Sequence, residues 1–472
     1  TAQDALRNEP DLQSFFLLLA FVSTATIIVG GLASDIFRRR ELMFGALATM
    51  VAGSAVSIVF DDGLIFVAAN FVAVAAAGVV LAFGIGSVAA AYDGIPRATA
   101  LGFVYGAFGA GAAASPAVLT LFPRLLPSDD PSVPSSFTFD TFVAYTLTAI
   151  TAGVALWAAM RWIPDLPGRL PTNKWFILGV GVWALGILAV VTGVLGLFGE
   201  ANVLLPVILV VVGVLALLTL RFRFDKTMDS VSGLRLDRRG LGAALAVGVA
   251  VGFAQAIPLM LLPVVFEYPL NYGTLLAIFA IAPFALALLL AGPISGVLIR
   301  RFGPRGIMTI GTAALGLANI LLALTLVWIT GSVRAAYQAN PDGSDPGLAE
   351  FHYVLFILPL VLVGAGFVLS TTVRTAIVFA STPRGLPASA AAINEASVGL
   401  GSRVGIVAAT TALTAAALGS ARGMVSDRPA AEATALVDEF ELALVSLGTP
   451  RFREVFDATL AEAEPIKLAA YS

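Results

Sequence analysis

Two charged residues occur inside one apolar stretch near the end of the chain. Glu395 and Arg403 lie in "AAINEASVGLGSRVGIV", residues 391–407, and are its only charged residues. A charge at the centre of a bilayer costs roughly 2.5–3.5 kcal/mol on insertion scales, so such residues normally face a cavity or a partner. On a helix the two would lie about 12 Å apart along the axis and about 80° around it. They are too distant for a direct pair, but together with Asn394 they could line one cavity.

Glu395 suits the binding and release of a proton. Burial disfavours the charged form of a carboxyl group, whereas an approaching cation favours it. A proton and a cationic substrate would then compete for Glu395, which is the minimal requirement for exchanging one for the other. The alternative is a structural carboxylate, paired with another helix or placed near an interface. Gln255 and Asn319 are weaker candidates for the same pathway, because buried amides in membrane helices often bind a neighbouring helix.

A second cluster of charge follows another apolar stretch, in "GLASDIFRRR", residues 31–40. Asp35 can accept charge-assisted hydrogen bonds from nearby arginines and from unpaired backbone N–H groups. Such a cluster can hold the ends of two helices together in one conformation and release them in another. The alternative is that the arginines anchor a helix end to anionic headgroups. A similar sequence, "GVLIRRFGPR", occupies residues 296–305, and anchoring is an equally good interpretation of its arginines, Arg300, Arg301 and Arg305.

These residues require elements that hold them away from water, and the composition indicates membrane-spanning helices. The chain is 58% hydrophobic and 12% charged, with a mean hydropathy of +0.94, whereas soluble proteins carry about 25% charged residues. Apolar stretches long enough to cross a hydrocarbon layer about 30 Å thick recur along the chain. They do not alternate apolar and polar residues, which excludes barrel strands. We expect twelve helices, at residues 13–33, 42–60, 64–91, 99–121, 141–160, 175–198, 203–220, 240–266, 271–299, 306–330, 353–380 and 387–419.

Loop charge predicts the orientation of these helices. Eighteen of the 27 Lys and Arg residues fall in alternate loops, starting with the loop that holds residues 38–40. The opposite internal loops hold only Arg124 and Arg334. Because cytoplasmic loops carry the excess of basic residues, we expect residues 38–40 in the cytoplasm and both ends of this chain outside. Arg374, in "STTVRTAIVF", is counted among the eighteen as a residue at a cytoplasmic helix end, with anion binding as the alternative.

The repeated motif also predicts the domain organisation. Two copies between corresponding helices indicate parallel repeats, related by an axis along the membrane normal. The chain begins with Thr1 and stops without a closing element, so we expect one helix to be missing at each end. The expected units are an N-terminal bundle (1–160), two extra helices with a cytoplasmic linker (161–239), a C-terminal bundle (240–419) and an acidic external loop (420–472).

The motifs, their spacing and the helix order resemble the major facilitator superfamily, most closely its fourteen-helix drug/proton antiporter branch. The resemblance covers essentially the whole chain, including "TPRGLPASAAAINEASVGLGSRVG", which is similar to the family's penultimate helix. In that family the loop between helices two and three reads roughly G-x-x-x-D-[RK]-x-G-[RK]-[RK]. Four residues match this pattern, namely Gly31, Asp35, Arg39 and Arg40, and two depart from it, Ile36 and Arg38. The resemblance implies that the motif is a cytoplasmic gate, to which we add Arg300 and Arg305 of the second copy.

Two departures weaken the inference of proton antiport. Helix four of the family usually carries an arginine, but "FVAANFVAVAAAG" has Asn70 near the expected place. Helix five of the antiporters usually reads G-x-x-x-G-P-x-x-G-G. In "GAAASPAVLT" Pro116 remains, and Ser115, Leu119 and Thr120 replace glycines.

We therefore expect an all-α, polytopic membrane protein with two pseudo-symmetric helical bundles, two extra helices between them and about twelve transmembrane helices. Its expected function is proton-coupled efflux of amphipathic small molecules by alternating access. The alternative is a facilitator, or an exporter of a metabolite or lipid, without proton coupling. The residues expected to line the pathway are Glu395, Arg403, Asn394, Gln255 and Asn70.

The sequence offers little for catalysis. It has no HExxH motif, no Walker-type glycine loop and a single histidine, so we expect neither an enzyme nor a cofactor or metal site. A net charge of −3 does not suggest nucleic acid as a partner. The expected partners are a small-molecule substrate, protons and the lipid bilayer, with the protein acting as a monomer in the cytoplasmic membrane.

Overall fold

The computed structural model describes residues 12–37, 39–59, 63–125, 136–162, 174–197, 204–228, 238–267, 280–339, 349–381 and 387–424. Within these ranges the chain forms eleven α-helices and no strand, as expected for an all-α protein. The helices are α2 (Leu12–Ile36), α3 (Arg39–Val59), α4 (Gly63–Ala91), α5 (Gly94–Leu125), α6 (Ser136–Trp162), α7 (Lys174–Gly196), α8 (Leu204–Met228), α9 (Arg238–Glu267), α11 (Ala282–Ala339), α12 (Ala349–Ser381) and α13 (Pro387–Met424). The first residues of the predicted acidic loop, 420–424, belong to α13, and the rest of the loop lies outside the described residues.

Two of the twelve predicted helices, 271–299 and 306–330, fall within α11, which consists of two helices that meet at a kink. The backbone of α11 is broken at Gly303, whose φ of 73° and ψ of 163° are not helical. A positive φ is a conformation that glycine adopts readily. Pro304 follows directly and cannot donate a backbone hydrogen bond to the preceding turn. The predicted loop is therefore a sharp break within one long helical segment.

Several of the described helices are long and apolar enough to cross a bilayer. Five such segments are Arg40–Val59, Ile65–Ala91, Gly240–Leu259, Ala282–Ile329 and Tyr353–Ser381, the fourth of which contains the break at Gly303. Shorter apolar helices lie at Phe21–Ile36, Gly181–Gly196 and Leu204–Leu218. Many large apolar side chains on these helices are exposed. Exposed apolar faces of this extent suit a surface in contact with lipid.

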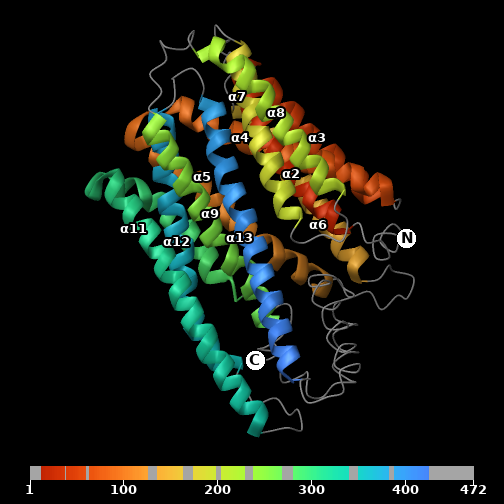
Figure 1. Ribbon diagram of the computed structural model, residues 1–472, viewed down its shortest axis with the longest axis vertical. Helices are drawn as coiled ribbons and strands as arrows, with labels where there is room; N and C mark the ends of the chain where they lie inside the picture. Colours follow the sequence, from red (N-terminus) through yellow and green to blue (C-terminus); the bar gives the residue numbers. More distant parts are fainter. Residues whose placement is uncertain are drawn as a thin grey trace.

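The helices form two groups that meet along α5 and α13. In the first group, α4 packs against α2 and α3, and α3 packs against α6; in the second, α12 packs against α9 and α11, and α13 against α9. We call α2–α6 the N-terminal bundle and α9–α13 the C-terminal bundle. Between the bundles, α13 packs against α2 and α4, and α5 packs against α11 and α12. Figure 1 shows α13 running between α2 on one side and α11 and α12 on the other.

The two remaining helices, α7 and α8, form a hairpin beside this junction. They pack closely: a Cβ atom on Gly213 would lie 2.6 Å from the carbonyl oxygen of Gly186. Close approach through small residues is a common basis of helix pairing in membranes. Helix α7 also packs against both α2 and α13, with Ile28, Leu188 and Ala396 forming a small buried cluster there. The accessory hairpin therefore touches both bundles through one helix.

The residues of the two sequence motifs gather at one end of the helices, which we call the basic end. Asp35 at the end of α2 contacts the start of α13. The Arg97 guanidinium, near the start of α5, lies 5.8 Å from the ring centroid of Phe379 near the end of α12. The bundles are in close contact here, since a Cβ on Gly102 of α5 would lie 2.0 Å from the Gly292 carbonyl of α11.

Candidate functional site

Asp35 binds the first residues of α13. Its carboxylate accepts hydrogen bonds from the backbone N–H groups of Ala388, at 3.2 Å, and Ser389, at 2.7 Å. The Ser389 hydroxyl donates a third, also at 2.7 Å. Helix α13 begins at Pro387, so these amides belong to its first turn, where N–H groups lack intrahelical partners and the helix dipole favours negative charge. The structure thus joins Asp35 to backbone N–H groups, one of the two partner types expected from sequence.

Gly31 allows α2 to approach α13 at this contact. A Cβ atom on Gly31 would lie 2.3 Å from the Cβ of Ala392 and 2.6 Å from the carbonyl oxygen of Ala388. Both distances are too short for any side chain, so only glycine fits here without displacing a helix. Asp35 is 1% exposed, and one buried contact therefore joins the N-terminal bundle to the start of α13.

The arginines of the gate motif do not all join this contact. Arg40 turns away from it: its guanidinium donates to the carbonyl oxygen of Met160, at 3.0 Å, near the end of α6, and lies 5.2 Å from the ring centroid of Phe44. This contact lies inside the N-terminal bundle, because α3 and α6 both belong to it. Arg38 and the side chain of Arg39 lie outside the described residues. The sequence-based pairing of Asp35 with Arg40 is replaced by a contact between Arg40 and a helix carboxyl end, where a cation is favoured.

The arginines of the second motif copy are placed differently from Asp35. Arg300 and Arg305 flank the break at Gly303 and are exposed. Arg301, also exposed, lies 5.5 Å from the ring centroid of its neighbour Phe302. No ion pair involving these three residues is found in the described part of the chain. Their positions fit anchoring at the membrane surface better than a gate contact.

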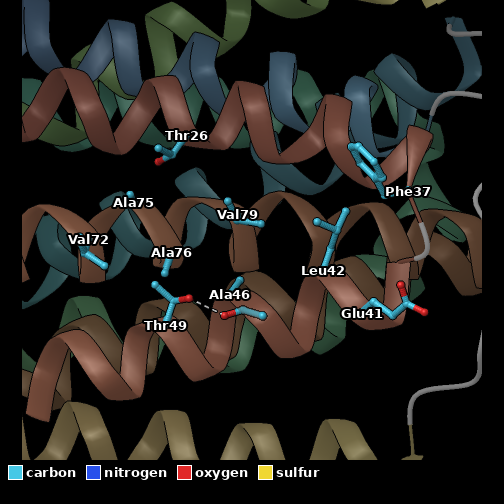
Figure 2. Close-up of a pocket in the computed structure, with 11 residues that line it drawn as sticks. Thr26, Phe37, Glu41, Leu42, Ala46, Thr49, Val72, Ala75, Ala76 and Val79 are labelled. Carbon is cyan, nitrogen blue, oxygen red and sulfur yellow. Dashed lines mark hydrogen bonds between the residues drawn. The ribbon is translucent and has the colours of Figure 1, made fainter.

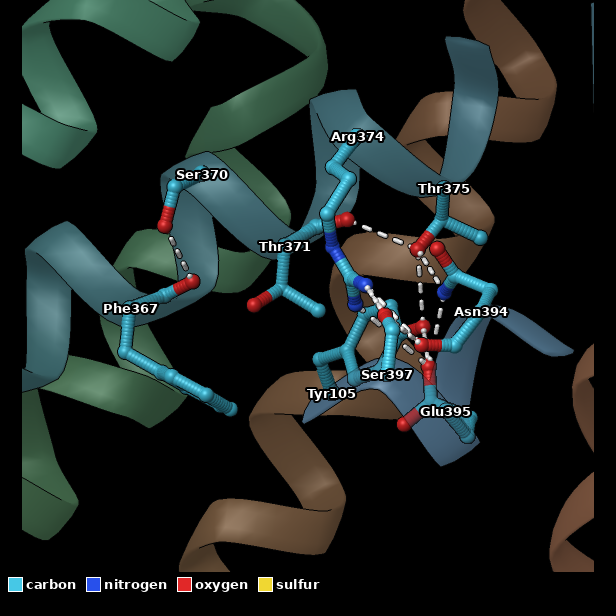
Figure 3. A network of polar contacts seen from close by, with 9 residues as sticks. All are labelled: Tyr105, Phe367, Ser370, Thr371, Arg374, Thr375, Asn394, Glu395 and Ser397. Carbon is cyan, nitrogen blue, oxygen red and sulfur yellow. Dashed lines mark hydrogen bonds and ion pairs between the residues drawn. The ribbon is translucent and has the colours of Figure 1, made fainter. Parts of the chain in front are cut away.

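Glu395 lies in a network of polar side chains from three helices, shown in Figure 3. We call this the polar network; its members are Tyr105 of α5, Arg374 and Thr375 of α12, and Asn394, Glu395 and Ser397 of α13. The Tyr105 hydroxyl donates to Glu395 Oε1 at 2.6 Å and lies 2.9 Å from Thr375 Oγ1. The Asn394 amide donates to the same Glu395 oxygen and to Thr375 Oγ1, both at 2.9 Å. The polar network therefore connects the N-terminal bundle, through Tyr105, to two helices of the C-terminal bundle.

Arg374 is the charge partner of Glu395. Its Nη2 lies 3.8 Å from Glu395 Oε1, and the two side chains are 0% and 12% exposed. Its Nη1 donates to the Asn394 carbonyl oxygen and to Ser397 Oγ, both at 2.9 Å. The structure therefore corrects the interpretation of Arg374 as a residue at a cytoplasmic helix end. One signal in the sequence could have indicated this: Arg374 lies inside "STTVRTAIVF", among hydroxyl residues in an apolar helix, with no turn residue nearby.

Buried polar atoms around Arg374 are not all satisfied. Its Nε and Nη2 have no hydrogen-bond partner in the described part of the chain, nor do the hydroxyls of Thr371 and Thr372 or the side-chain oxygen of Asn394. All four of these residues are 0% exposed. Leaving a buried donor or acceptor without a partner costs about 1–3 kcal/mol. The ion pair between Arg374 and Glu395 is thus surrounded by buried donors and acceptors that could still form hydrogen bonds.

Arg403 occupies a separate place on α13 and contacts two other helices. Its Nη2 donates to the Thr24 hydroxyl of α2 at 2.5 Å, and its Nη1 donates to the Thr192 hydroxyl of α7 at 3.0 Å. The expectation that Glu395 and Arg403 do not form a direct pair agrees with these contacts. Instead, Arg403 links the C-terminal bundle to the N-terminal bundle and to the accessory hairpin.

The predicted amide residues make local contacts elsewhere. The Asn70 side-chain oxygen accepts a short hydrogen bond from Tyr145 of α6, so it ties α4 to α6 within one bundle. The Asn319 amide donates to the carbonyl oxygen of Ala254 in α9 at 3.0 Å. Gln255 is half-buried, and no hydrogen bond joins its side chain to the polar network among the described residues. Of the five predicted pathway residues, only Glu395 and Asn394 lie together.

Other site types are not indicated. Within the described residues, no group of three or more His, Cys, Asp or Glu side chains could hold a metal ion. The "GAAASPAVLT" stretch of α5 begins at Gly111, and its other side chains lie outside the described residues. Among the described residues, side chains join α13 to the N-terminal bundle at Asp35, at Glu395 and at Arg403.

Residues 3–406 match the Major Facilitator Superfamily. Because the match covers most of the chain, this chain belongs to that superfamily and is a multi-pass membrane transporter. This confirms the superfamily assignment made from the motifs. The fourteen-helix drug/proton antiporter branch stays a prediction. No curated protein sequence matches the chain.

Solved structures share the fold at low sequence identity. An auto-inhibited peptide transporter of the POT family gives a TM-score of 0.52 at 15% identity, over 98% of this chain and 88% of that one. A XylE variant with two tryptophan substitutions gives 0.50 at 16% identity, over 96% and 88%. The human organic anion transporter MFSD10 (TETRAN) gives 0.49 at 13% identity, over 97% and 83%. The first two likenesses concern the fold alone.

Proposed function

We propose that the protein exports amphipathic small molecules in exchange for protons, with Glu395 as the residue that binds the proton. The observation that carries this proposal is the cross-bundle hydrogen bond between the Tyr105 hydroxyl and Glu395 Oε1, at 2.6 Å. A carboxylate that one bundle supplies and the other bundle binds can link protonation to movement of the bundles. Hydrogen bonds to a charged acceptor are stronger than those to a neutral one. Protonation of Glu395 would therefore weaken the contact with Tyr105.

The direction of coupling follows from which end is closed. If the basic end faces the cytoplasm, as loop charge predicts, the conformation described here is closed to the cytoplasm. A proton arriving from outside would neutralise Glu395, weaken the bond to Tyr105 and leave Arg374 without its counter-charge. Both changes favour separation of α5 from α12 and α13, which opens the basic end. Release of the proton and binding of the substrate inside would then restore the closed contact.

Asp35 supplies the second contact that must break in this cycle. Among its partners are the first-turn amides and the hydroxyl of Ser389, none of which changes protonation in an ordinary pH range. We assign Asp35 and Gly31 to the cytoplasmic gate. The exposed Arg300 and Arg305 are better suited to anchoring, and the part of Arg39 in the gate stays a prediction.

Arg374 changes the expected chemistry at Glu395. A permanent positive charge 3.8 Å from the carboxylate already balances it, so a cationic substrate gains little by approaching Glu395 directly. Exchange would instead arise because substrate and proton favour opposite states of the cross-bundle contact. This arrangement is compatible with substrates whose own charge is small or lies outside the network.

A second candidate function is transport of a metabolite or lipid without proton coupling. It is favoured by the same ion pair, because a carboxylate stabilised by Arg374 can stay ionised throughout the cycle. The polar network would then serve only to fasten the closed conformation. Both candidates place a monomer in the cytoplasmic membrane.

The test compares proton movement in the wild type and two variants. Everted membrane vesicles containing the full-length protein are energised and exposed to lipophilic cations and neutral drugs while internal pH is followed. Substrate-dependent proton release is expected in the wild type, is lost in Glu395→Gln and is reduced in Tyr105→Phe. Tyr145→Phe is the matched control, since Tyr145 donates to Asn70 within one bundle. Substrate movement that persists in Glu395→Gln and ignores a collapsed pH gradient would support the uncoupled alternative.

A further inference from the structure

Arg403 lies deep inside the helical region, on the side of α13 that faces the N-terminal bundle. It follows Pro387, the first residue of α13, by sixteen residues, which is roughly 24 Å along a helix axis. Its Nη2 donates to the hydroxyl of Thr24, the middle residue of α2. A Cβ atom on Gly399, one turn before Arg403, would lie 3.3 Å from the same hydroxyl oxygen. Arg403 therefore lies between the two bundles and far from either end of α2.

The positive charge of Arg403 has no counter-charge among the described residues. A guanidinium stays protonated in proteins. The partners of Arg403 are the neutral hydroxyls of Thr24 and Thr192, which are 4% and 1% exposed. No acidic side chain forms an ion pair with it in the described part of the chain, whereas Arg374 is balanced by Glu395. Because a charge within a membrane normally faces a cavity or a partner, this position suits a ligand that supplies negative charge.

The guanidinium of Arg403 has hydrogen-bonding capacity left for such a ligand. It carries five N–H donors, and the hydroxyls of Thr24 and Thr192 use two of them. The side chain is half-buried, so part of it is accessible. A planar guanidinium matches the paired oxygens of a carboxylate, sulfonate or phosphate group. The chemistry of this site therefore selects an oxoanion.

The side chains around Arg403 are apolar. Phe21 lies one turn from Thr24 on α2, and Leu400 lies one turn from Arg403 on α13. Both pack against the buried cluster that contains Leu188 of α7. A single cation within apolar walls is complementary to a molecule that has an apolar body and one anionic group.

The cavity between α2, α3 and α4 does not offer an oxoanion the same chemistry. Its volume is about 510 Å³, and Figure 2 shows Thr26 of α2 on one side of it and Thr49 of α3 on the other. None of the described residues that line this cavity is basic. An acidic group therefore meets a counter-charge at Arg403 and not among those residues.

We infer that Arg403 binds the anionic group of the transported molecule, so that the exported amphiphiles are acids with a carboxylate, sulfonate or phosphate group on an apolar body. The inference rests on the proposed export and names the charge class of its substrates. Eight residues separate Arg403 from Glu395, roughly 12 Å along α13, so a bound acid leaves the ion pair of Glu395 with Arg374 in place. An anionic phospholipid carries the same oxoanion at the membrane surface, whereas Arg403 binds the middle of α2.

The experiment measures Kd for pyrenebutyrate and pyrenebutanol, which share an apolar body and differ in charge. The purified full-length protein is placed in nanodiscs of phosphatidylcholine, so that no anionic lipid competes. We expect the wild type to bind the acid more tightly than the alcohol. Arg403→Gln should weaken binding of the acid about tenfold, equivalent to about 1.4 kcal/mol, and should leave binding of the alcohol unchanged.

Two further variants control for the change of side chain. Arg403→Lys keeps the charge but loses the planar fork, so its Kd for the acid should lie between those of the wild type and Arg403→Gln. Arg300→Gln removes a charge at an exposed position and should change neither Kd. A wild type that binds both compounds equally, or an Arg403→Gln variant that weakens both to the same extent, overturns the acid site. Should Arg403→Gln fail to fold, Arg403→Lys decides: its affinity must fall for the acid and not for the alcohol.

Proton exchange separates this inference from the proposed function. If vesicles with the wild type exchange no amphiphile for protons, the proposed function fails, and the Kd comparison still decides whether Arg403 binds an acid. If they exchange neutral or cationic compounds but not pyrenebutyrate, the proposed function stands and the acid site is overturned. If native mass spectrometry finds an anionic phospholipid that Arg403→Gln expels while Kd for the acid stays unchanged, Arg403 binds a lipid and the inference is wrong.

Discussion

The contacts of α13 with the N-terminal bundle at Asp35 and at Glu395 serve the same pair of bundles with different chemistry. Asp35 accepts from two backbone amides and a serine hydroxyl at the start of α13. Glu395, two turns further along, accepts hydrogen bonds from a tyrosine and an amide and forms an ion pair with a guanidinium 3.8 Å away. The partners of Asp35 are fixed by where a helix begins, whereas those of Glu395 come from side chains on three helices.

This difference teaches how the two contacts would respond to pH. The contact at Asp35 depends on helix geometry, and its donors keep their protons. The contact at Glu395 depends on a charge balance with Arg374 inside the membrane-spanning region, which a single proton upsets. We therefore expect the contact at Asp35 to hold the basic end closed whether or not a proton is bound. We expect the contact at Glu395 to make opening of that end depend on the proton.

The largest effect should come from unbalancing the charge pair. Arg374→Gln leaves Glu395 without its counter-charge, and removing one partner of a buried pair typically costs about 3–5 kcal/mol. We expect a large loss in the thermal stability of the purified protein. The double variant Arg374→Gln/Glu395→Gln should recover a substantial part of it, because no charge is then left unpaired.

Arg300→Gln is the control for this change, since it removes an exposed arginine from the same bundle. Surface substitutions of this kind usually change stability by less than about 0.5 kcal/mol. Two outcomes would show that the two residues are not a balanced pair. In one, Arg374→Gln is as thermally stable as the wild type; in the other, the double variant is less stable than Arg374→Gln.

Breaking the contact between Asp35 and the start of α13 should have the next largest effect. Asp35→Asn keeps the side-chain shape but removes the charge, and hydrogen bonds to charged groups contribute about 1.5–3 kcal/mol. We expect the basic end to open more often. The chain has no cysteine, so Ser295→Cys, a near-isosteric change at a 0% exposed position beside Gly102, gives a single reporter.

Labelling of that cysteine by a maleimide added on the basic side measures the opening. Asp35→Asn should raise the labelling rate about tenfold, as expected for a change of about 1.4 kcal/mol, and to the same extent at neutral and at alkaline pH, where an ordinary carboxyl group is ionised. A rise that appears only at one pH would remove the distinction drawn between Asp35 and Glu395.

The two contacts also differ in how far the sequence predicts them. The gate motif predicts that Asp35 binds backbone N–H groups, because a helix start is a local feature that sequence reveals. The residues that supply those groups, Ala388 and Ser389, are 353 and 354 residues away from Asp35, and the sequence does not pair them with it. The twelve apolar stretches predict the all-α architecture well, apart from the fusion of two of them at Gly303.

The polar network could be predicted only in part. A lone acid in an apolar helix marks Glu395 from sequence alone, since its cost in a membrane demands a partner. The identity of that partner depends on how α12 and α13 pack, which hydropathy does not encode. Loop counting assigns Arg374 to a helix end, because it treats an arginine near a predicted boundary as a loop residue. Tyr105 gave no signal, because a tyrosine in an apolar helix is unremarkable until its hydroxyl meets a carboxylate.

Tyr105→Phe tests the Glu395 contact alone and should have a smaller effect on opening of the basic end. It removes one hydrogen bond between the bundles, and such bonds in membrane proteins average about 0.6 kcal/mol. With the Ser295→Cys reporter, labelling should rise about threefold at neutral pH, and the increase produced by acidification should shrink. Tyr145→Phe, which loses a hydroxyl within one bundle, should change neither quantity. A pH response equal to that of the wild type would show that Tyr105 does not transmit the state of Glu395.

The smallest effect should come from Arg403 of α13, whose guanidinium donates to hydroxyls of α2 and α7. Thr24→Val removes its contact with α2, and Thr192→Val removes its contact with α7, each at a cost of about 0.6 kcal/mol. Only the first contact joins the two bundles, so Thr24→Val should raise Ser295→Cys labelling about threefold, and Thr192→Val should leave labelling unchanged while lowering thermal stability slightly. If Thr192→Val raises labelling as much as Thr24→Val, the accessory hairpin also takes part in closing the basic end, and the comparison must include its contact with α13.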